Sequence, residues 1–242
     1  MARPAARKST KDRIVEAAIT LFNESGIAAV TTNHVAEHAG ISPGNLYYHY
    51  ANKEEIIRDV FERVNAEADV IWGGPESAPG DSASGAASVP RVDVGAFHRM
   101  LVGNLGLFAR YAFFARELPS LLRADPILRA RYVDVAQRRT EQLETLLAPF
   151  IKAGLLRDLD DPEDLHALVE TAWVLGLFCI PYSETLDASA APRSARAKAE
   201  RLHQAIERGA LLVLHLLRPH LDPMAYAALV VLVRTELHGS AP

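Results

Sequence analysis

The strongest constraint on the fold of this 242-residue chain is the spacing of its apolar residues, which recur at intervals of three and four. Near the N-terminus, Ile14, Ala18, Leu21 and Phe22 fall on one side of a helix, as in a helix that is half buried. Nowhere does the sequence sustain the apolar/polar alternation that is typical of a β-strand. The sequence therefore predicts an all-α fold.

Several helix starts are marked by a capping side chain followed by proline. A proline at the first helical position costs nothing there, because its missing N–H would have no partner in any case. The pattern occurs at Ser42-Pro43, Asp125-Pro126, Asp161-Pro162 and Asp222-Pro223. Asn52, with Glu55 three residues later, resembles a capping box that opens another helix. In the C-terminal part, these signals and the periodicity predict helices near 93–110, 111–122, 126–153, 162–180, 195–218 and 223–238.

Composition narrows the class of protein. With 49% hydrophobic and 23% charged residues, the chain has the mix of a globular protein. Its one cysteine, Cys179, excludes an internal disulfide framework, and no Cys/His cluster suggests structural zinc. The longest charge-free stretch, 171–183, is shorter than the roughly 20 residues that a membrane-spanning helix needs, and the basic N-terminus is followed by no apolar run. We therefore expect a soluble, cytoplasmic protein without a cofactor or a membrane partner.

Charge and composition also divide the chain. The net charge is −4, yet residues 1–13 carry +4, so a short basic arm precedes an acidic body and only that end is expected to meet a polyanion. Residues 73–90 consist mostly of Gly, Pro, Ser and Ala, a composition that cannot bury enough apolar surface to offset its ordering entropy. We predict a flexible arm (1–12), a small helical domain (13–60, its last helix continuing to about 72), a linker (73–92) and a larger helical domain (93–240).

The segment from Thr32 has the spacing of a helix-turn-helix. A small residue lies inside the first helix, a glycine follows four places later, and apolar residues flank the turn: Ala36, Gly40, Ile41 and Leu46. An αα-hairpin with a purely structural role is the alternative. The second helix, however, carries three tyrosines and a histidine outward of Leu46, and phenol and imidazole groups can reach phosphate oxygens on DNA. This composition favours a DNA-binding motif.

The stretch TTNHVAEHAGISPGNLYYHYANKEE, residues 31–55, closely resembles the DNA-binding domain of the TetR family of bacterial transcriptional repressors. The resemblance extends from about Arg13 to Val60 and includes the leading helix. It implies a three-helix DNA-binding domain followed by a helical-bundle domain for ligand binding and dimerisation. It also implies a homodimer that places two recognition helices in successive major grooves of a palindromic operator. A small molecule bound to the C-terminal domain would release the DNA.

The resemblance also implies roles for individual residues. Thr32 and Lys53 match phosphate-binding positions, and Asn33 matches a position that often reads a base. The base-facing start of the recognition helix corresponds to Pro43, Gly44 and Asn45, and the contacts to the DNA backbone correspond to Tyr47, Tyr48 and His49. Because no side chain extends from Gly44, we expect Asn45, Pro43 and DNA shape to share the readout. Basic residues of the arm would add salt-sensitive, sequence-independent affinity: Arg3, Arg7, Lys8 and Lys11.

Two short patterns resemble catalytic motifs but lack the required context. Gly40-Ile-Ser-Pro-Gly44 spells a nucleophile elbow, yet a helix precedes it and Pro43 has no N–H to serve an oxyanion hole. His34 and His38 spell part of a zinc-protease signature, on a predicted helix of only about two turns. We expect solvated or phosphate-proximal histidines there. The sequence therefore predicts no catalytic residues and no metal site, and the protein is not expected to be an enzyme.

The C-terminal body carries a dimerisation signal. Residues 209–217, GALLVLHLL, are apolar almost all round a helix, so that helix must be covered on both sides. A stripe in the helix near 162–180 makes that helix its expected companion: Leu168, Ala172, Leu175 and Cys179. Two such helices from each subunit, near 162–180 and 195–218, would form a four-helix bundle. A helix that is central to a monomeric bundle is the alternative.

Polar residues among apolar ones are candidates for a ligand pocket, although a structural role is the alternative for each of them. They are His98, Asn104, Arg110, Tyr111, Glu117, His166, Glu170 and Trp173. Leu, Phe and Ala dominate these helices, so a hydrophobic or amphipathic ligand is expected. We interpret Cys179 as a core residue, because a redox sensor would need an electropositive setting.

The sequence as a whole predicts a homodimeric, ligand-responsive repressor that binds double-stranded DNA. One alternative is a DNA-binding regulator without a small-molecule ligand, controlled by a protein partner. Its body would have a cavity filled by side chains. A helical-bundle enzyme is a second alternative, and it would require a cluster of titratable groups where the sequence shows only scattered ones.

Overall fold

The computed structural model describes residues 8–72, 103–104, 106–157, 159, 161–186 and 194–239. Within these ranges every regular element is a helix, and the one β-type contact is an isolated bridge between Leu156 and Leu221. The predicted all-α fold is therefore confirmed. The predicted linker 73–92, His98, and Arg3 and Arg7 of the arm lie outside the described residues.

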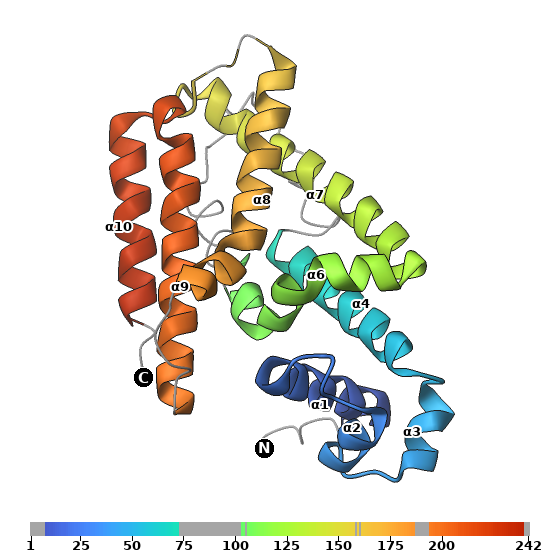
Figure 1. The fold of residues 1–242 in the computed structure, drawn as a ribbon. Helices are drawn as coiled ribbons and strands as arrows, with labels where there is room; N and C mark the ends of the chain where they lie inside the picture. The colour runs from blue at the N-terminus through green and yellow to red at the C-terminus, as the bar shows by residue number, and fades with distance from the viewer. Residues whose placement is uncertain are drawn as a thin grey trace, which may run out of the picture.

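The N-terminal domain consists of three helices followed by a long connecting helix, α1 (Thr10–Ser25), α2 (Thr32–His38), α3 (Pro43–His49) and α4 (Lys53–Ile71) (Figure 1). Ser9 and Asp12 form a capping box at the start of α1, so the helix begins at Thr10, three residues before the predicted start of the helical domain at 13. The domain closes around fully buried apolar side chains from all four helices, among them Phe22, Val35, Leu46 and Ile56.

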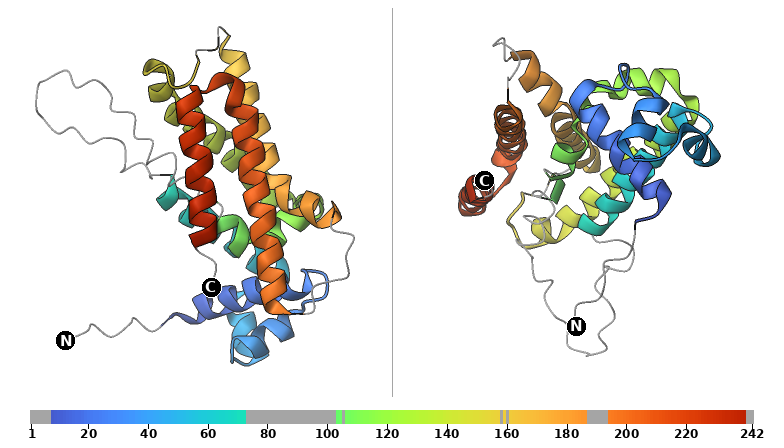
Figure 2. Two further views of the ribbon diagram at one scale, coloured as in Figure 1. Left: turned by 90° about the vertical axis from the view of Figure 1, so that its left-hand side faces the viewer. Right: turned by 90° about the horizontal axis from the view of Figure 1, so that it is seen from below.

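The larger domain contains α6 (Ala112–Ala124), α7 (Pro126–Lys152), α8 (Pro162–Leu186), α9 (Ala195–Leu217), the short 3₁₀-helix η2 (Arg218–His220) and α10 (Pro223–Gly239). α9 lies between α8 and α10, and α6 lies where this layer meets α1 and α4 (Figures 1 and 2). The predicted helices near 111–122, 126–153, 195–218 and 223–238 agree with α6, α7, α9 and α10 to within two residues at each end, whereas α8 continues past 180, with Pro181 inside the helix, to Leu186. Of the predicted helix near 93–110, residues 93–102 and 105 lie outside the described residues.

All four predicted capping side chains accept hydrogen bonds from backbone N–H groups at the helix starts. Ser42 accepts from Asn45, and Asp161 accepts from Glu163. Asp125 accepts from Ile127 and Leu128, and Asp222 accepts from Met224 and Ala225. Asn52 likewise accepts from Glu55 N–H at 2.9 Å. The Glu55 carboxylate, however, accepts from Ala51 N–H at 2.7 Å, one residue before the donor that a capping box would use. These side chains accept hydrogen bonds from the N–H groups that the first turn of a helix leaves unpaired, and for this reason the helix starts could be predicted.

Asp125 also ties the two domains together. Its Oδ2 accepts from Arg58 Nε of α4 at 2.7 Å, while its Oδ1 caps α7. Burial alone would raise the pKa of Asp125, but the hydrogen bonds from Arg58 and from the helix N–H groups outweigh it, so the pKa lies below its usual value. The connecting helix α4 is thus anchored to the corner between α6 and α7.

α8 and α9 approach each other closely at Gly209. A Cβ on Gly209 would lie 2.5 Å from Cys179 Cβ and 2.6 Å from its Sγ, which is closer than real contacts allow. Burial raises the pKa of the Cys179 thiol to about 11, so it stays protonated at neutral pH. Cys179 is therefore a core residue, and the helix crossing requires glycine opposite it.

We predict that Gly209→Ala lowers the free energy of unfolding by about 1 kcal/mol or more, because the cost of overpacking exceeds the helix-propensity gain of about 1 kcal/mol. Gly176→Ala on α8 is the matched control. Its new Cβ would meet only Phe108 at an ordinary 3.8 Å, so this change should be neutral or stabilising. Urea unfolding of both variants at one protein concentration measures the difference. Equal effects of the two substitutions would contradict the assigned crossing.

Candidate nucleic-acid interface

Helix α3 buries one side chain and turns the rest of its surface outward. Leu46 is fully buried, whereas Asn45, Tyr47 and Tyr48 are exposed, Tyr48 to 85%. His49 is half-buried. The prediction that three tyrosines project outward is wrong for Tyr50, which is only 3% exposed. Because the helix ends at His49, the extended backbone of Tyr50 turns its ring inward.

Tyr50 instead joins α3 to α4. Its hydroxyl donates to the Asp59 carboxylate, and Lys11 Nζ of α1 lies 5.1 Å from the centre of the Tyr50 ring. Burial, followed by the hydrogen bond to Asp59, raises the pKa of Tyr50, so the hydroxyl remains a donor. Lys11, predicted as part of the DNA-binding arm, also pairs with Asp59 at 3.5 Å. Lys8 is exposed.

The turn between α2 and α3 is held rigidly. Gly40 has φ +64°, a left-handed conformation that favours glycine at the end of a helix. Arg13 of α1 donates from Nη2 to the carbonyl oxygens of Ala39 at 2.5 Å and Gly40 at 3.2 Å. Pro43 and Gly44, at the start of α3, are exposed, and a Cβ on Gly44 would meet nothing within 4 Å. This end of α3 therefore offers an open surface.

Residues of α2 and of the start of α4 flank that surface. Thr32 Oγ1 and the Tyr47 hydroxyl lie 3.0 Å apart, so two predicted phosphate ligands from different helices are brought together. Asn33 is exposed beside Thr32. Lys53 Nζ donates to the carbonyl oxygens of Ile27 at 2.8 Å and Val30 at 3.0 Å. Since an ammonium group has three donors, one N–H of Lys53 remains for another acceptor.

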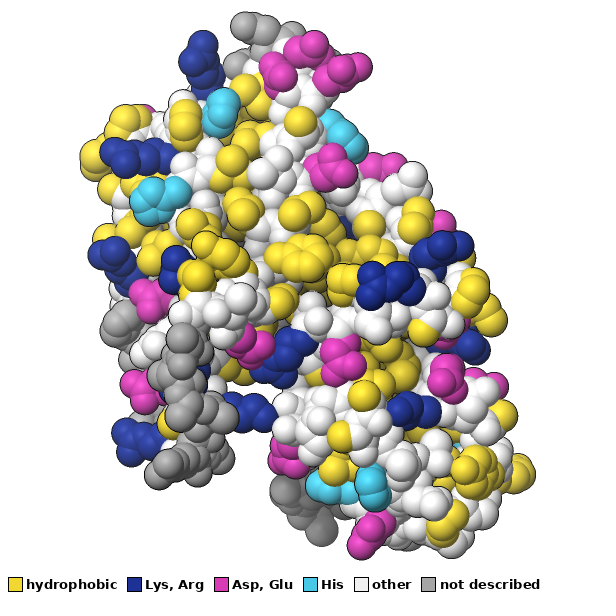
Figure 3. Space-filling view, viewed as in Figure 1, with side chains coloured by type: hydrophobic (Ala, Val, Ile, Leu, Met, Phe, Trp, Pro, Cys, Tyr) yellow, Lys and Arg dark blue, Asp and Glu magenta, His cyan; other side chains and the backbone are white. Residues whose placement is uncertain are grey.

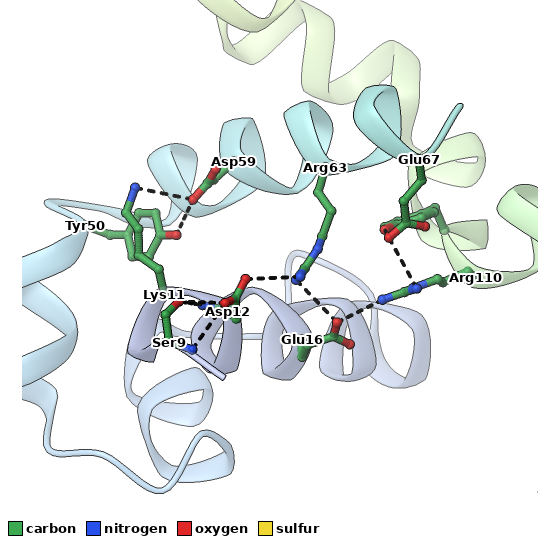
Figure 4. Close-up of polar contacts among 10 residues, drawn as sticks. Ser9, Lys11, Asp12, Glu16, Tyr50, Asp59, Arg63, Glu67 and Arg110 are labelled. Carbon is green, nitrogen blue, oxygen red and sulfur yellow. Dashed lines mark hydrogen bonds and ion pairs between the residues drawn. The ribbon is translucent and has the colours of Figure 1, made fainter. Parts of the chain in front are cut away.

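Three of the predicted ligand residues lie instead at the joint between the domains. Arg110 pairs with Glu16 of α1 at 2.9 Å and with Glu67 of α4 at 3.2 Å. The Tyr111 hydroxyl donates to Glu67 Oε1 at 2.9 Å, and burial raises the pKa of Tyr111. Arg63 of α4 continues the chain of charges, 3.3 Å from Glu16 (Figure 4). The joint thus links α1, α4 and the start of α6.

Glu117, the third of these residues, and Asn23 of α1 each accept a hydrogen bond from a backbone N–H of the other domain. Glu117 accepts from the N–H of Ile27, just after α1, at 2.9 Å. In return, Asn23 of α1 accepts from the N–H of Phe113 at 3.0 Å and donates to the carbonyl of Arg110 at 2.7 Å. The N-cap residue of α6 makes no side-chain cap of its own, so Asn23 satisfies that helix end from the other domain. Sequence analysis missed Asn23, since nothing in its neighbourhood indicates a partner 90 residues away.

Three of the other predicted ligand residues lie along α8. His166 Nδ1 lies 2.7 Å from Glu144 Oε1 on an exposed part of α8, Glu170 is exposed, and Trp173 is half-buried. Asn104 accepts a hydrogen bond from Trp72 Nε1 at 3.0 Å. For His166, Glu170 and Trp173 a ligand contact stays a prediction.

Comparison with known proteins places this geometry in a family. Residues 14–60 match the model described as bacterial regulatory proteins, tetR family, and residues 82–229 match a model described as bacterial transcriptional repressor. The biofilm operon icaADBC HTH-type negative transcriptional regulator IcaR of Staphylococcus epidermidis is 46% identical over 52 residues, covering 22% of this chain and 28% of that protein. The match thus spans about a quarter of the length of such curated relatives.

Two further comparisons extend well beyond the helix-turn-helix segment. The HTH-type transcriptional repressor KstR2 of Rhodococcus jostii is 23% identical over 172 residues, which cover 69% of this chain and 78% of that protein. The crystal structure of a TetR-family transcriptional regulator from Marinobacter aquaeolei superposes with a TM-score of 0.75 at 26% identity, covering 94% of this chain and 98% of the other. The similarity therefore includes the larger domain as well as the helix-turn-helix.

Proposed function

Because this chain belongs to the TetR family of bacterial transcriptional repressors, we propose that it acts as a homodimer that binds a palindromic operator and is released by a small hydrophobic or amphipathic ligand. The observation that carries the proposal is the exposed face of α3 on a rigid four-helix frame. A short helix that exposes two tyrosines and an asparagine in this way suits contacts to phosphates and base edges.

In this proposal the contacts divide by chemistry. Asn45 and Pro43 would meet base edges, because they stand at the open end of α3. Asn33 of α2 is exposed and would be a further base-reading residue. The DNA backbone would be bound by hydroxyl, imidazole and ammonium groups around the open end of α3: Thr32, Tyr47, Tyr48, His49 and Lys53. Lys8 and the preceding basic residues would add affinity that falls with salt.

An exposed apolar face supports the homodimer. Val174, Phe178 and Tyr182, one turn apart on α8, are 47%, 41% and 51% exposed, and Leu212 of α9 is 39% exposed. Hydrophobic side chains gather over this part of α8 and α9 (Figure 3). By length and composition alone, Glu163–Leu186 could cross a membrane, but the helix packs on α9. We propose that a second copy of the same face covers it, as a four-helix bundle.

The joint between the domains supports ligand control. α6 is tied to α1 through Asn23 and Glu117, so a shift of α6 within the larger domain would move α1 and the attached α3. A ligand would act by favouring one spacing of the two recognition helices over another. A complete switch requires a difference in ligand affinity between the two states of about 5 kcal/mol.

Selection of random duplex DNA by the purified protein at moderate salt tests the proposed function. We expect enrichment of a palindrome with half-sites about one DNA turn apart, since two α3 helices would enter successive major grooves. Retention of all sequences alike, falling steeply as salt rises, would contradict sequence-specific binding.

Mutations should distinguish the contacts to the DNA backbone from the contacts to base edges. Tyr47→Phe is expected to weaken binding about tenfold on every sequence, because it removes a phosphate-binding hydroxyl that also contacts Thr32. Asn45→Ala is expected to change which bases are preferred, with a loss of about 1–3 kcal/mol on the selected site. Fluorescence anisotropy on selected and scrambled duplexes measures both variants, and Tyr226→Phe on α10 serves as the control. If Asn45→Ala left the preference unchanged, the assigned docking of α3 would be wrong.

A further inference from the structure

A crevice of about 730 Å³ opens where the C-terminal end of α1 meets α6, α8 and α9. Its volume lies within the usual range for small-molecule sites, roughly 300–1,000 Å³. Leu186 of α8 and Leu202 of α9 line its apolar side. Of the described residues that were candidates for ligand binding, only Glu117 lines it. The crevice therefore lies between the domains, apart from the other residues that the sequence singled out.

Basic side chains surround this crevice: Arg116, Lys198, Arg201 and Arg208. Figure 3 shows Lys and Arg side chains beside the hollow between the lower end of α9 and the N-terminal domain. Arg116 is neutralised by Glu184, with Nε 2.8 Å from Oε1. Lys198 and Arg208 have neutral partners instead. Lys198 Nζ donates to the carbonyl of Asn23 at 2.9 Å, and the Arg208 guanidinium lies 5.8 Å from the centre of the Tyr182 ring. Neither contact cancels the positive charge.

The acidic side chains of the crevice compensate this charge only in part. Glu184 is paired with Arg116, whereas Glu117 accepts the neutral N–H of Ile27 and keeps its negative charge. Glu24 is exposed at the end of α1. Four cations thus face three carboxylates, and this excess of positive charge beside an apolar side is the complement of an anionic head on an apolar body.

We propose that the crevice binds an organic anion whose single negative group pairs with Lys198 and whose apolar body lies against Leu186 and Leu202. Such a ligand touches α1 and the larger domain at once. It displaces or shares the Lys198–Asn23 contact, which is one of the links between the domains. The inference rests on the proposed ligand control for its effect on DNA, but not for binding itself.

Titration calorimetry of the full-length protein with decanoate, decanol and decylammonium tests the site, because these probes share one chain and differ in charge. We expect decanoate to bind about tenfold more tightly than the other two, as for one charged hydrogen bond. Lys198→Met should remove that advantage, and Lys198→Arg should retain it. Glu24→Gln should tighten decanoate binding about two- to threefold, since it removes a like charge. Lys152→Met, the same change on an exposed lysine of α7, is the control.

Three results would contradict the proposed anion-binding site. They are equal affinity for decanoate and decanol, a decanoate affinity that Lys198→Met leaves unchanged, and an equal loss on Lys152→Met. The selected operator then separates this inference from the proposed function. Decanoate should weaken operator binding by the wild type and not by Lys198→Met. If decanoate binds as expected while operator affinity stays constant, anion binding in the crevice is supported and control of DNA binding through the crevice is contradicted.

Discussion

Asp125→Ala is expected to lower the free energy of unfolding by about 3 kcal/mol, the largest stability effect predicted for a single side chain here. The substitution removes the cap of α7, a contribution of about 1 kcal/mol, and leaves the Arg58 guanidinium without its partner. Both side chains are largely shielded from water, with exposed fractions of 7% for Asp125 and 23% for Arg58. Urea denaturation at a fixed protomer concentration measures the change.

The Asp125 carboxylate should also make the stability of the protein fall at acidic pH. Its pKa is lower in the folded protein than in the unfolded chain, so its stabilisation is fully present above the unfolded value of about 4. The stabilisation is lost as the pH falls through the folded pKa. Asp125→Asn, which keeps a capping oxygen but no charge, should therefore be less stable than the wild type at pH 7. The gap should narrow as the pH approaches 3.

Asp134→Ala, on the exposed face of α7, is the control for Asp125 and should change stability by no more than about 0.5 kcal/mol. An effect of Asp125→Ala as small as that of Asp134→Ala would show that the anchor between α4 and the α6–α7 corner contributes little. A gap between wild type and Asp125→Asn that stayed constant down to pH 3 would contradict the lowered pKa.

Features with a local cause could be predicted from the sequence. Ser42 and Asp161 cap helices through N–H groups two or three residues away, so a short pattern contains the whole interaction. Gly40 has the left-handed conformation because the turn between α2 and α3 requires it. The helix-turn-helix and most helix bounds followed from such signals.

Features that depend on distant partners could not be predicted. Arg13 was counted as one charge of a basic arm, yet it holds the α2–α3 turn through carbonyls 26 and 27 residues away. Arg110 and Glu117 were interpreted as pocket residues because they are polar among apolar neighbours. Their partners, Glu16 and Ile27, belong to the other domain. A polar residue next to an apolar face is expected both in a pocket and in a joint, and the sequence alone does not distinguish them.

The sequence predicts a dimer interface formed by the helices near 162–180 and 195–218. The structure indicates which side chains of these helices are free to contact a second subunit. Leu168 and Cys179, in the stripe predicted on α8, are buried within the protomer. Val174, Phe178 and Tyr182 of the same helix are exposed. A helix with both buried and exposed apolar residues needs two partners, and α9 supplies one of them.

Phe178→Glu is therefore expected to convert the dimer into a monomer and to reduce operator affinity at least about 100-fold. A charge at the centre of an apolar interface would be buried without a partner. Loss of the second half-site then removes the gain from simultaneous binding of two recognition helices, about 100- to 10,000-fold. Sedimentation velocity measures the oligomeric state, and anisotropy on the selected operator measures affinity.

Because Phe178 is 41% exposed in the protomer, the fold itself should tolerate the change, and circular dichroism should show unchanged helix content. Val133→Glu, at a residue 50% exposed on α7, introduces the same charge away from the proposed interface and should leave a dimer that binds normally. A Phe178→Glu protein that remained dimeric would place the interface elsewhere. A monomeric variant with full operator affinity would show that one recognition helix is sufficient, and the proposed palindrome would then lose its physical basis.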